Sequence, residues 1–354
     1  MPEMDSSVSI VVPCRNEAGA IRAFLESLLA QNLEGLDWEV IVADGMSDDG
    51  TLAILEEYSQ REPRIRAIDN PGRIVSTGLN AAIAVARGEV ILRMDAHTEY
   101  ECDYVWKCLN VLAETAAANV GGPWIARGKT YIAKAIAAAF QSRVSAGTAC
   151  GHNAHYEGPV DTVYLGCWRR ETMLRVGLFD ETLIRNQDDE LNLRLIRAGG
   201  TIWQSARIRS WYQPRSDLAS LFRQYFQYGF WKVAVIRKHR IPASWRHLAP
   251  GAFVLANLTL PLAATLAWGL GATSSARWLG WSWVVQAAAY TVLLLSASAA
   301  TAAERGWDLL PVLPAVFAVY HVSYGLGFLA GLAHFLPWRS AQPRPGKLFT
   351  DVTR

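Results

Sequence analysis

Charged side chains are scarce in this sequence. Asp, Glu, Lys and Arg make up 19% of its 354 residues, whereas hydrophobic residues make up 51%, so the chain is poorer in charge than an average soluble domain. This balance argues against a chain made only of soluble domains. The formal net charge of +2 is uninformative by itself, and we expect no nucleic-acid partner.

Cysteine is scarce as well, and a secretory signal is lacking. The five cysteines are Cys14, Cys102, Cys108, Cys150 and Cys167. No two of them form a CxxC pair, which favours free thiols over disulfides or a zinc site. The N-terminal segment does not show the basic stretch followed by a hydrophobic one that is typical of a signal peptide. We therefore expect the first two thirds of the chain to stay in the cytoplasm.

Long apolar runs fill the last third, over residues 248–270, 278–300 and 311–336. Each is long enough for the roughly 20 residues of a membrane-spanning helix. Between residues 248 and 336 the only charged residues are Arg277, Glu304, Arg305 and Asp308. A basic cluster precedes the first run and consists of Arg237, Lys238, His239, Arg240, Arg246 and His247. Such a cluster suits the inner, anionic face of a membrane.

These features predict four parts of a multi-pass protein of the inner (plasma) membrane. We expect a cytoplasmic catalytic domain over residues 1–215, about three transmembrane helices over 248–338 and a tail over 339–354. Over 217–238 apolar residues recur at helical spacing, so residues 216–247 are expected to hold an interfacial amphipathic helix and a basic juxtamembrane segment. Three spans place the tail residues Arg339, Arg344, Lys347 and Arg354 outside, against the positive-inside tendency. Either one run is re-entrant or interfacial, or the tail does not follow this tendency.

The first part of the chain alternates between apolar strands and helical segments. Strands are predicted at 8–13, 38–44, 64–68 and 89–95, and helices at 20–31, 51–61, 76–87 and 188–198. Continuous β-branched runs divided by helices predict an α/β, Rossmann-like fold with a mostly parallel sheet. Ligands bind beyond the carboxyl ends of the strands in such sheets. An irregular, Gly-rich loop over 147–159 is expected near the site.

Two of these strand ends carry candidate site residues. Asp44 ends a strand, and its carboxylate could accept a hydrogen bond from a uracil N–H or a ribose hydroxyl; alternatively, its Asp-Gly pair only forms a turn, with Ser47 or Asp49 capping the next helix. Asp95 and His97 follow another strand and could both reach one divalent ion, which would offset the growing charge of a diphosphate. A satisfied loop histidine is the alternative for His97.

A dense acidic cluster opens the predicted helix at 188–198. It consists of Asp188, Asp189 and Glu190 beside Gln187. Negative charge is favoured at a helix N-terminus, so ordinary capping is one interpretation. Three acids exceed what capping needs, and one of them could act as a general base. Among the tryptophans we single out Trp231 for stacking on a sugar, although most tryptophans are core residues or interface anchors.

Several motifs occur in the order found in family 2 glycosyltransferases, which share the GT-A fold. VSIVVPCRNEAGAI and EVIVADGMSDDGT resemble the family's P-x-x-N-E and D-G-S-x-D-x-T elements. NPGRIVSTGLNAAIAVARGEVILRMDAH resembles the stretch leading to D-x-D, and GCWRRETMLRVGLFDETLIRNQDDELNLRLIRAGG resembles the region ending in E-D-x-D-L-x-x-R. The resemblance covers residues 8–238 and is strongest to the ExoA-like, succinoglycan-type exopolysaccharide transferases. It implies a GT-A catalytic domain followed by an α-helical transmembrane region.

The resemblance also implies roles for matching residues. Pro13, Arg15, Glu17 and Asp44 would line the nucleotide pocket, Arg73 and Asn80 would lie near the diphosphate or sugar, and Asp95 would contact the donor and, with His97, hold Mg²⁺ or Mn²⁺. Asp188 matches the catalytic base, which implies in-line attack with inversion. Gln187, Asp189, Glu190 and Trp231 are placed on the acceptor side.

Three departures from the family pattern matter. His97 replaces the last acid of D-x-D and softens the metal ligands. Gln187 replaces the acid beside the base, which removes a neighbouring charge and would lower the pKa of the base relative to the usual arrangement. The processive motif Q-x-x-R-W reads QYGFW at 227–231, so we expect addition of a single sugar rather than polymerisation.

The expected activity is transfer of a hexose, glucose in our prediction, from a UDP-linked donor to a polyprenyl-linked or other lipid acceptor in polysaccharide biosynthesis. A membrane anchor would hold the active site at the height of the lipid headgroups and raise the effective concentration of the acceptor. Two alternatives stay open. One is an enzyme that makes a polyprenyl monophosphate sugar, and the other is a catalytically silent membrane scaffold.

Overall fold

The computed structural model describes residues 7–146, 153–242, 244–336 and 346–350. Much of the loop predicted at 147–159 and the tail residues Arg339, Arg344 and Arg354 lie outside the described residues. The chain forms two compact units. The first consists of Met1–Ala126 and Ala149–Gln213, and the second of Arg127–Thr148 and Pro214–Arg354.

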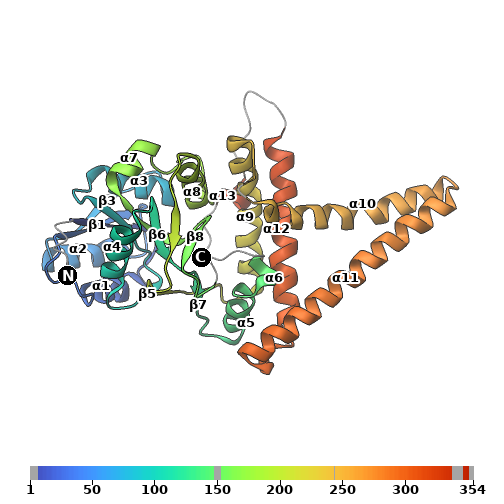
Figure 1. Ribbon diagram of the computed structural model, residues 1–354, viewed down its shortest axis with the longest axis horizontal. Coiled ribbons are helices and arrows are strands. Elements are labelled where there is room, and N and C mark those ends of the chain that lie inside the picture. Colours follow the sequence, from blue (N-terminus) through green and yellow to red (C-terminus); the bar gives the residue numbers. More distant parts are fainter. Residues whose placement is uncertain (1–6, 147–152, 243, 337–345, 351–354) are drawn as a thin grey trace. The chain divides into compact units, whose positions relative to one another are not determined.

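The first unit is built on an eight-stranded sheet with the order β3-β2-β1-β4-β9-β6-β10-β8 (Figure 1). Its strands are β1 Val8–Cys14, β2 Trp38–Asp44, β3 Ile65–Asp69, β4 Val90–Arg93, β6 Asn119–Gly122, β8 Gly158–Val160, β9 Tyr164–Arg169 and β10 Ile202–Gln204. The first four strands are parallel, whereas β9 is antiparallel to both β4 and β6. The prediction of a mostly parallel sheet is therefore confirmed.

Helices cover both faces of this sheet. They are α1 Ile21–Leu29, α2 Thr51–Arg61, α3 Val75–Val85, α4 Tyr104–Thr115, α7 Arg170–Val176 and α8 Gln187–Arg197. Successive side chains of a strand point to opposite faces. Ile10 and Val12 accordingly share one hydrophobic cluster with Leu55 of α2, and Val11 shares the other with Leu79 of α3. The apolar runs of the sequence are thus buried on both sides.

A second, smaller sheet lies in the same unit. Its three strands have the order β5-β11-β7, with β5 at Thr98–Tyr100, β7 at Ile125–Ala126 and β11 at Ser210–Tyr212. β11 is antiparallel to β5 and parallel to β7. The loop that follows β4 and contains the D-A-H motif therefore leads directly into this sheet.

The second unit is helical. Its helices are α5 Tyr131–Phe140, α6 Arg143–Ala146, α9 Leu218–His239, α10 Ala249–Gly269, α11 Thr273–Arg305, α12 Leu313–Phe335 and α13 Lys347–Thr350. Among the described residues, three stretches are long and apolar enough to cross a membrane, Trp245–Gly269, Thr273–Arg305 and Leu313–Phe335. The predicted order of an α/β domain followed by a helical membrane region is confirmed.

The division of the chain differs from the predicted boundary at residue 215, because Arg127–Thr148 belongs to the helical unit. The Tyr320 hydroxyl of α12 donates a hydrogen bond to the Ile136 carbonyl oxygen at 3.1 Å. His321 Nε2 lies 2.9 Å from the Val144 carbonyl oxygen. These contacts attach α5 and α6 to α12.

Candidate active site

The loops that follow β1 and β2 are joined around Asp44. The Asp44 carboxylate is buried and accepts hydrogen bonds from the backbone N–H and the hydroxyl of Ser47, at 2.9 and 2.5 Å. The same hydroxyl accepts from the Asn16 N–H at 2.8 Å, and the Asn16 side chain accepts from the Asp48 N–H at 3.0 Å. Asp44 therefore holds the turn after β2, and an ionised carboxylate has acceptor sites beyond these two hydrogen bonds.

Glu17 extends this network toward the D-A-H loop. Its N–H donates to the Thr51 hydroxyl at 2.8 Å, which joins the start of α1 to the start of α2. Its carboxylate is buried, and Oε1 lies 3.9 Å from Nδ1 of His97. The loops after β1, β2 and β4 thus meet at the carboxyl ends of their parallel strands, as expected for a ligand-binding edge.

Asp95 is held by Arg93, the last residue of β4. The Arg93 guanidinium donates from two nitrogens to the two Asp95 oxygens, both at 3.2 Å. The Tyr100 hydroxyl accepts from the Asp95 N–H at 2.7 Å and donates to the Asp95 carbonyl oxygen at 3.1 Å. Both the side chain and the backbone of Asp95 are therefore fixed.

Arg93 also connects Asp95 with the predicted catalytic base. Burial opposes its positive charge, but the carboxylates of Asp95 and then Asp188 outweigh burial, and the pKa of Arg93 is raised. The two acids, which lie far apart in the sequence, therefore act on one guanidinium. Sequence reasoning missed Arg93, although a charged residue inside a strand buried on both faces requires a partner.

Aromatic rings surround the same group of charges. Tyr164 of β9 is buried, its hydroxyl lies 2.7 Å from the Thr98 hydroxyl, and its pKa is raised by burial and by the Asp95 charge. Its ring stacks on Trp124 with centroids 5.1 Å apart, and Tyr212 meets both rings edge-on. This aromatic group was also missed from the sequence, because its members come from three separate segments.

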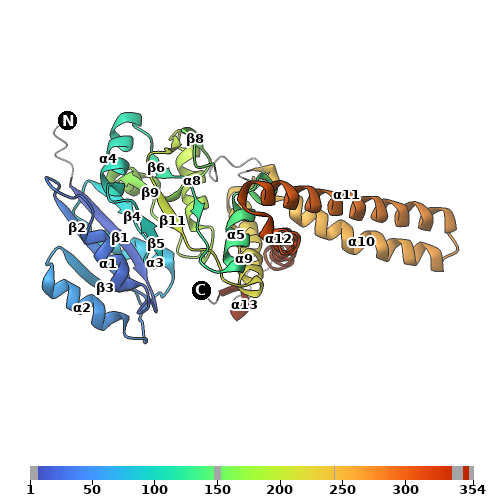
Figure 2. The ribbon, with the colours of Figure 1, turned by 90° about the horizontal axis from the view of Figure 1, so that it is seen from below.

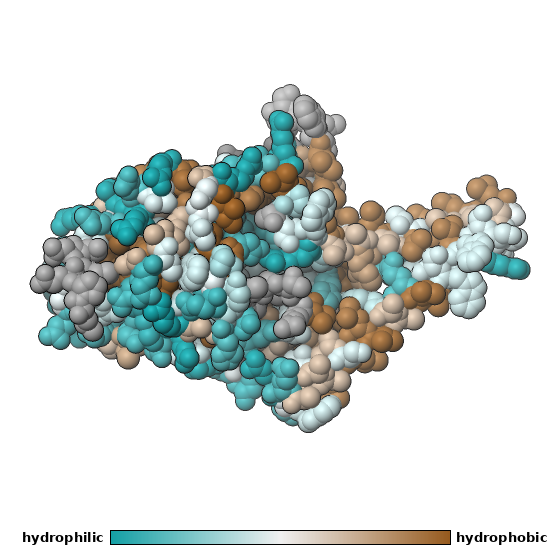
Figure 3. Space-filling model, viewed as in Figure 1, coloured by the Kyte–Doolittle hydropathy of each residue, from teal (hydrophilic) through white to brown (hydrophobic). Residues whose placement is uncertain are grey.

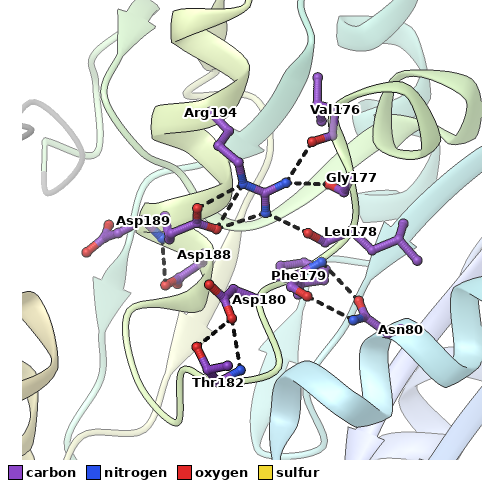
Figure 4. Close-up of polar contacts among 11 residues, drawn as sticks. Asn80, Val176, Gly177, Leu178, Phe179, Asp180, Thr182, Asp188, Asp189 and Arg194 are labelled. Carbon is purple, nitrogen blue, oxygen red and sulfur yellow. Dashed lines mark hydrogen bonds and ion pairs between the residues drawn. The ribbon is translucent and has the colours of Figure 1, made fainter. Parts of the chain in front are cut away.

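Figure 4 shows how α8, which carries the predicted base, is fastened to the segment after α7. The Glu190 carboxylate is fully buried and accepts hydrogen bonds of 2.9, 3.0 and 2.8 Å from Arg194, one turn later. The same guanidinium donates to the carbonyl oxygens of Val176, Gly177 and Leu178 at 2.8, 2.6 and 2.5 Å. These bonds fix the first turn of the helix.

The rest of the predicted acceptor side divides between the two units. Gln187 is buried in the first turn of α8, and the Asp189 N–H donates to the Asp188 carboxylate at 2.9 Å. Trp231 belongs to α9 in the second unit, where its indole is buried and donates to the Phe349 carbonyl oxygen at 2.9 Å.

The remaining predicted donor residues occupy different environments. Pro13 pairs with Ala43 in the sheet. Arg15 is exposed and packs its aliphatic stem against Gly45, and Arg73 is exposed with a positive φ of 61°.

Asn80 differs from these residues in binding the protein itself. Its side-chain amide exchanges two hydrogen bonds of 2.9 Å with the Phe179 backbone (Figure 4) and donates to Glu181 at 2.9 Å. These bonds connect α3 with the segment that precedes α8.

A divalent cation is compatible with the D-A-H loop. Within the described ranges no group of three His, Cys, Asp or Glu side chains is arranged to hold a metal. Mg²⁺ is usually bound by one or two protein carboxylates together with substrate phosphates. The pair of Asp95 and His97, both half-buried on one loop, fits a site of that kind, which a donor diphosphate would complete.

Comparisons with known proteins agree with this arrangement. Residues 9–147 match glycosyl transferase family 2. The succinoglycan biosynthesis protein ExoA of Rhizobium meliloti (strain 1021) is 35% identical over 257 residues, which cover 70% of this chain and 76% of that protein. A dolichyl N-acetyl-alpha-D-glucosaminyl phosphate 3-beta-D-2,3-diacetamido-2,3-dideoxy-beta-D-glucuronosyltransferase of Methanococcus voltae is 26% identical over 73% of this chain and 82% of that protein.

A solved structure shares the fold. The mannosyltransferase PcManGT of Pyrobaculum calidifontis, in complex with GDP-Man and Mn²⁺, aligns with a TM-score of 0.58 and 18% identity over 92% of this chain and 87% of that one. At this identity the likeness concerns the fold, which is GT-A in both. The chain therefore belongs to glycosyl transferase family 2 and is a glycosyltransferase.

Proposed function

We propose that this enzyme inverts the anomeric centre while it transfers a hexose, glucose, from a UDP-linked donor to a lipid-linked acceptor in polysaccharide biosynthesis. The observation that carries the proposal is that the carboxylates of Asp95 and Asp188 both raise the pKa of the buried Arg93. Arg93 therefore links the loop that would bind the donor with the proposed base. The names of the two relatives support synthesis of a polysaccharide and an acceptor attached to a lipid.

Asp188 is the base in this proposal. Its carboxylate takes the proton of the acceptor hydroxyl as the acceptor oxygen bonds to the anomeric carbon and the bond to the donor diphosphate breaks. The Asp189 N–H donates a hydrogen bond to this carboxylate, whose charge also acts on the Arg93 guanidinium. Gln187 and Asp189 line the acceptor side.

The donor is bound at the edge formed by the first four strands. Pro13, Arg15, Glu17, Asp44 and Arg73 contribute to the nucleotide and diphosphate pocket. Asp95 and His97 would hold Mg²⁺ or Mn²⁺, which would supply positive charge to offset the leaving diphosphate. We give Asn80 and Glu190 positioning roles, because their polar groups bond to Phe179 and Arg194 within the protein.

A matched pair of variants tests the base. Asp188→Asn should abolish sugar transfer but leave nucleotide binding, measured by calorimetry, unchanged. Asp37→Asn removes the same charge from an exposed loop residue and should keep full activity. Substantial turnover by the Asp188→Asn enzyme would contradict the assignment.

Metal binding is tested separately from turnover. Wild-type protein with UDP should bind Mn²⁺, as followed by electron paramagnetic resonance, and the Asp95→Ala/His97→Ala variant should not. EDTA should stop transfer by the wild type. Equal Mn²⁺ binding by both proteins would exclude these two side chains as ligands.

The substrates are tested with purified enzyme in lipid. Radiolabelled UDP-glucose or GDP-mannose is combined with either a polyprenyl diphosphate sugar or a polyprenyl monophosphate. The proposal expects label from UDP-glucose on the diphosphate-linked acceptor. Label on polyprenyl monophosphate would identify the lipid monophosphate sugar synthase instead, and absence of nucleotide binding would identify a silent scaffold.

A further inference from the structure

The described part of the helical unit contains three helices that could cross a membrane by length and composition. These helices differ in how much of their surface is buried against the rest of the protein. We infer that only the α10–α11 hairpin enters the bilayer and that α12 stays beside α9 on the membrane side where the chain begins. Everything before α10 and after α11 then lies on one side. This inference does not depend on the proposed donor or acceptor.

The first step is the direction of α9 and α12, which pack closely along each other. The rings of Tyr225 and Tyr320 have centroids 4.4 Å apart. Further along both helices, a Cβ added to Gly327 would collide with the backbone carbonyl of Phe226, and one added to Gly331 would lie 2.6 Å from the Phe230 carbonyl oxygen. The residue numbers rise together on both helices, so α9 and α12 are parallel.

Parallel packing excludes a simple three-span topology. If α12 crossed from inside to outside, α9 alongside it would cross in the same direction, and α10 would then start on the outer side. α9 is unsuited to cross, because it buries Gln224, Gln227 and Lys232 and is not among the helices apolar enough to span. A charged residue at the centre of a bilayer costs about 2.5–3.5 kcal/mol even on the mildest scale.

The segment after α12 leads to the same conclusion. Gln227 Nε2 donates to the Leu348 carbonyl oxygen of α13 at 3.0 Å, and the Trp231 indole donates to the Phe349 carbonyl oxygen at 2.9 Å. The Phe349 ring stacks on Phe230 with centroids 4.1 Å apart. α13 is therefore attached to α9, so the segment after α12 lies on the same side of the membrane as α9.

The hairpin itself has the surface of a lipid-facing element. Leu255, Leu258, Leu262 and Leu266 form an exposed stripe along α10, with exposures of 48%, 57%, 60% and 59%. Figures 1 and 2 show α10 and α11 running out together, while α9 and α12 run across them. Figure 3 shows mostly brown and pale residues over the visible part of the hairpin. At about 1.5 Å per residue, the 21 residues of α10 span about 30 Å, the thickness of a hydrocarbon core.

Aromatic and basic residues mark the two ends of the hairpin. Trp268 and Trp278 are exposed beside its turn, and Trp245 is exposed at its base, as expected for residues at two membrane–water interfaces. Arg277 is the only charged residue near the turn, whereas the basic cluster at residues 237–247 precedes the base of the hairpin. The base therefore fits the anionic inner face, and the conflict of a basic tail on the outside disappears.

Substituted cysteines test this topology in the full-length protein. Ser274→Cys places a thiol at the exposed turn, and Gly346→Cys places one at an exposed position after α12, where an added Cβ meets no atom within 4 Å. Spheroplasts and their lysates are treated with a membrane-impermeant maleimide. Wild type is the matched control, because its exposed Cys102 in the first unit reports leakage of the reagent.

We expect the Ser274→Cys protein to be labelled already in sealed spheroplasts, and its Cys102 to add further label only after lysis. The Gly346→Cys and wild-type proteins should be labelled only after lysis. Labelling at position 346 in sealed spheroplasts would show that α12 crosses the membrane and would overturn the inference. Labelling at position 274 only after lysis would overturn it as well, because the hairpin would then not reach the outer side.

Discussion

Replacing Arg194 should destabilise the catalytic unit far more than replacing an exposed arginine of similar geometry. Arg194→Ala leaves the fully buried Glu190 carboxylate without its cation and removes the donor for three backbone carbonyl groups. Removing one partner of a buried ion pair costs about 3–5 kcal/mol. Each kcal/mol lowers the Tm of a unit of 150–250 residues by about 2–4 °C, so we expect a decrease of about 6–20 °C.

The control is Arg22→Ala, because Arg22 also donates to a glutamate from two nitrogens, at 3.0 and 2.7 Å, but its side chain is 46% exposed. An exposed pair contributes about 0–1 kcal/mol, so this variant should lose less than about 4 °C. Both proteins are melted in the same detergent, with tryptophan fluorescence as the readout. Adding Glu190→Met to the Arg194→Ala variant should recover part of the loss, because no buried carboxylate is then left unpaired. Equal Tm values for the Arg194→Ala and Arg22→Ala proteins would refute the reasoning.

Two further predictions concern other parts of the molecule. Gly327→Ala places a Cβ against a backbone carbonyl of α9 and should cost about 1–3 kcal/mol through overpacking. Gly280→Ala in α11, with open space around it, should not lower the Tm, because Ala favours a helix over Gly. Equal Tm values for the two variants would contradict the close contact. Burial opposes ionisation of Glu39, but hydrogen bonds from the Arg87 N–H and the Ser9 hydroxyl outweigh it and lower its pKa. Glu39 therefore stabilises the folded state above the ordinary glutamate pKa of about 4.3, and this contribution is lost as the pH falls below that value. The Tm difference between wild type and Glu39→Gln should shrink from pH 7 to pH 4, and a constant difference would contradict this.

Most elements of the first unit could be predicted because their local signals are strong. The helix predicted at 51–61 coincides with α2, and the strand predicted at 38–44 coincides with β2. Both are bounded by turn residues, such as Gly45 and Gly50, and their apolar residues follow the period of the element. The long apolar helices were equally evident, since composition alone identifies them.

What the sequence did not reveal depends on contacts between distant segments. Arg93 is unremarkable in the sequence, and only the fold brings Asp188 near it. The antiparallel position of β9, which places Tyr164 beside Thr98, has no local signal either. The parallel packing of α9 and α12 also has no local signal, because the sequence of an apolar helix does not indicate the direction of the helix beside it. Local periodicity therefore predicted the elements, whereas the partners of buried charges required the fold.

The small sheet has a mechanical consequence for the D-A-H loop. β11 ends at Tyr212, just before the first unit ends at Gln213 and the chain continues toward α9. β5 begins directly after His97, and the two strands pair from Ser210↔Tyr100 to Tyr212↔Thr98. Tension on the connection to the helical unit is therefore borne by the hydrogen-bonded ladder of this sheet. A pull on this connection would therefore pass through β11 to β5, the strand that adjoins the D-A-H loop.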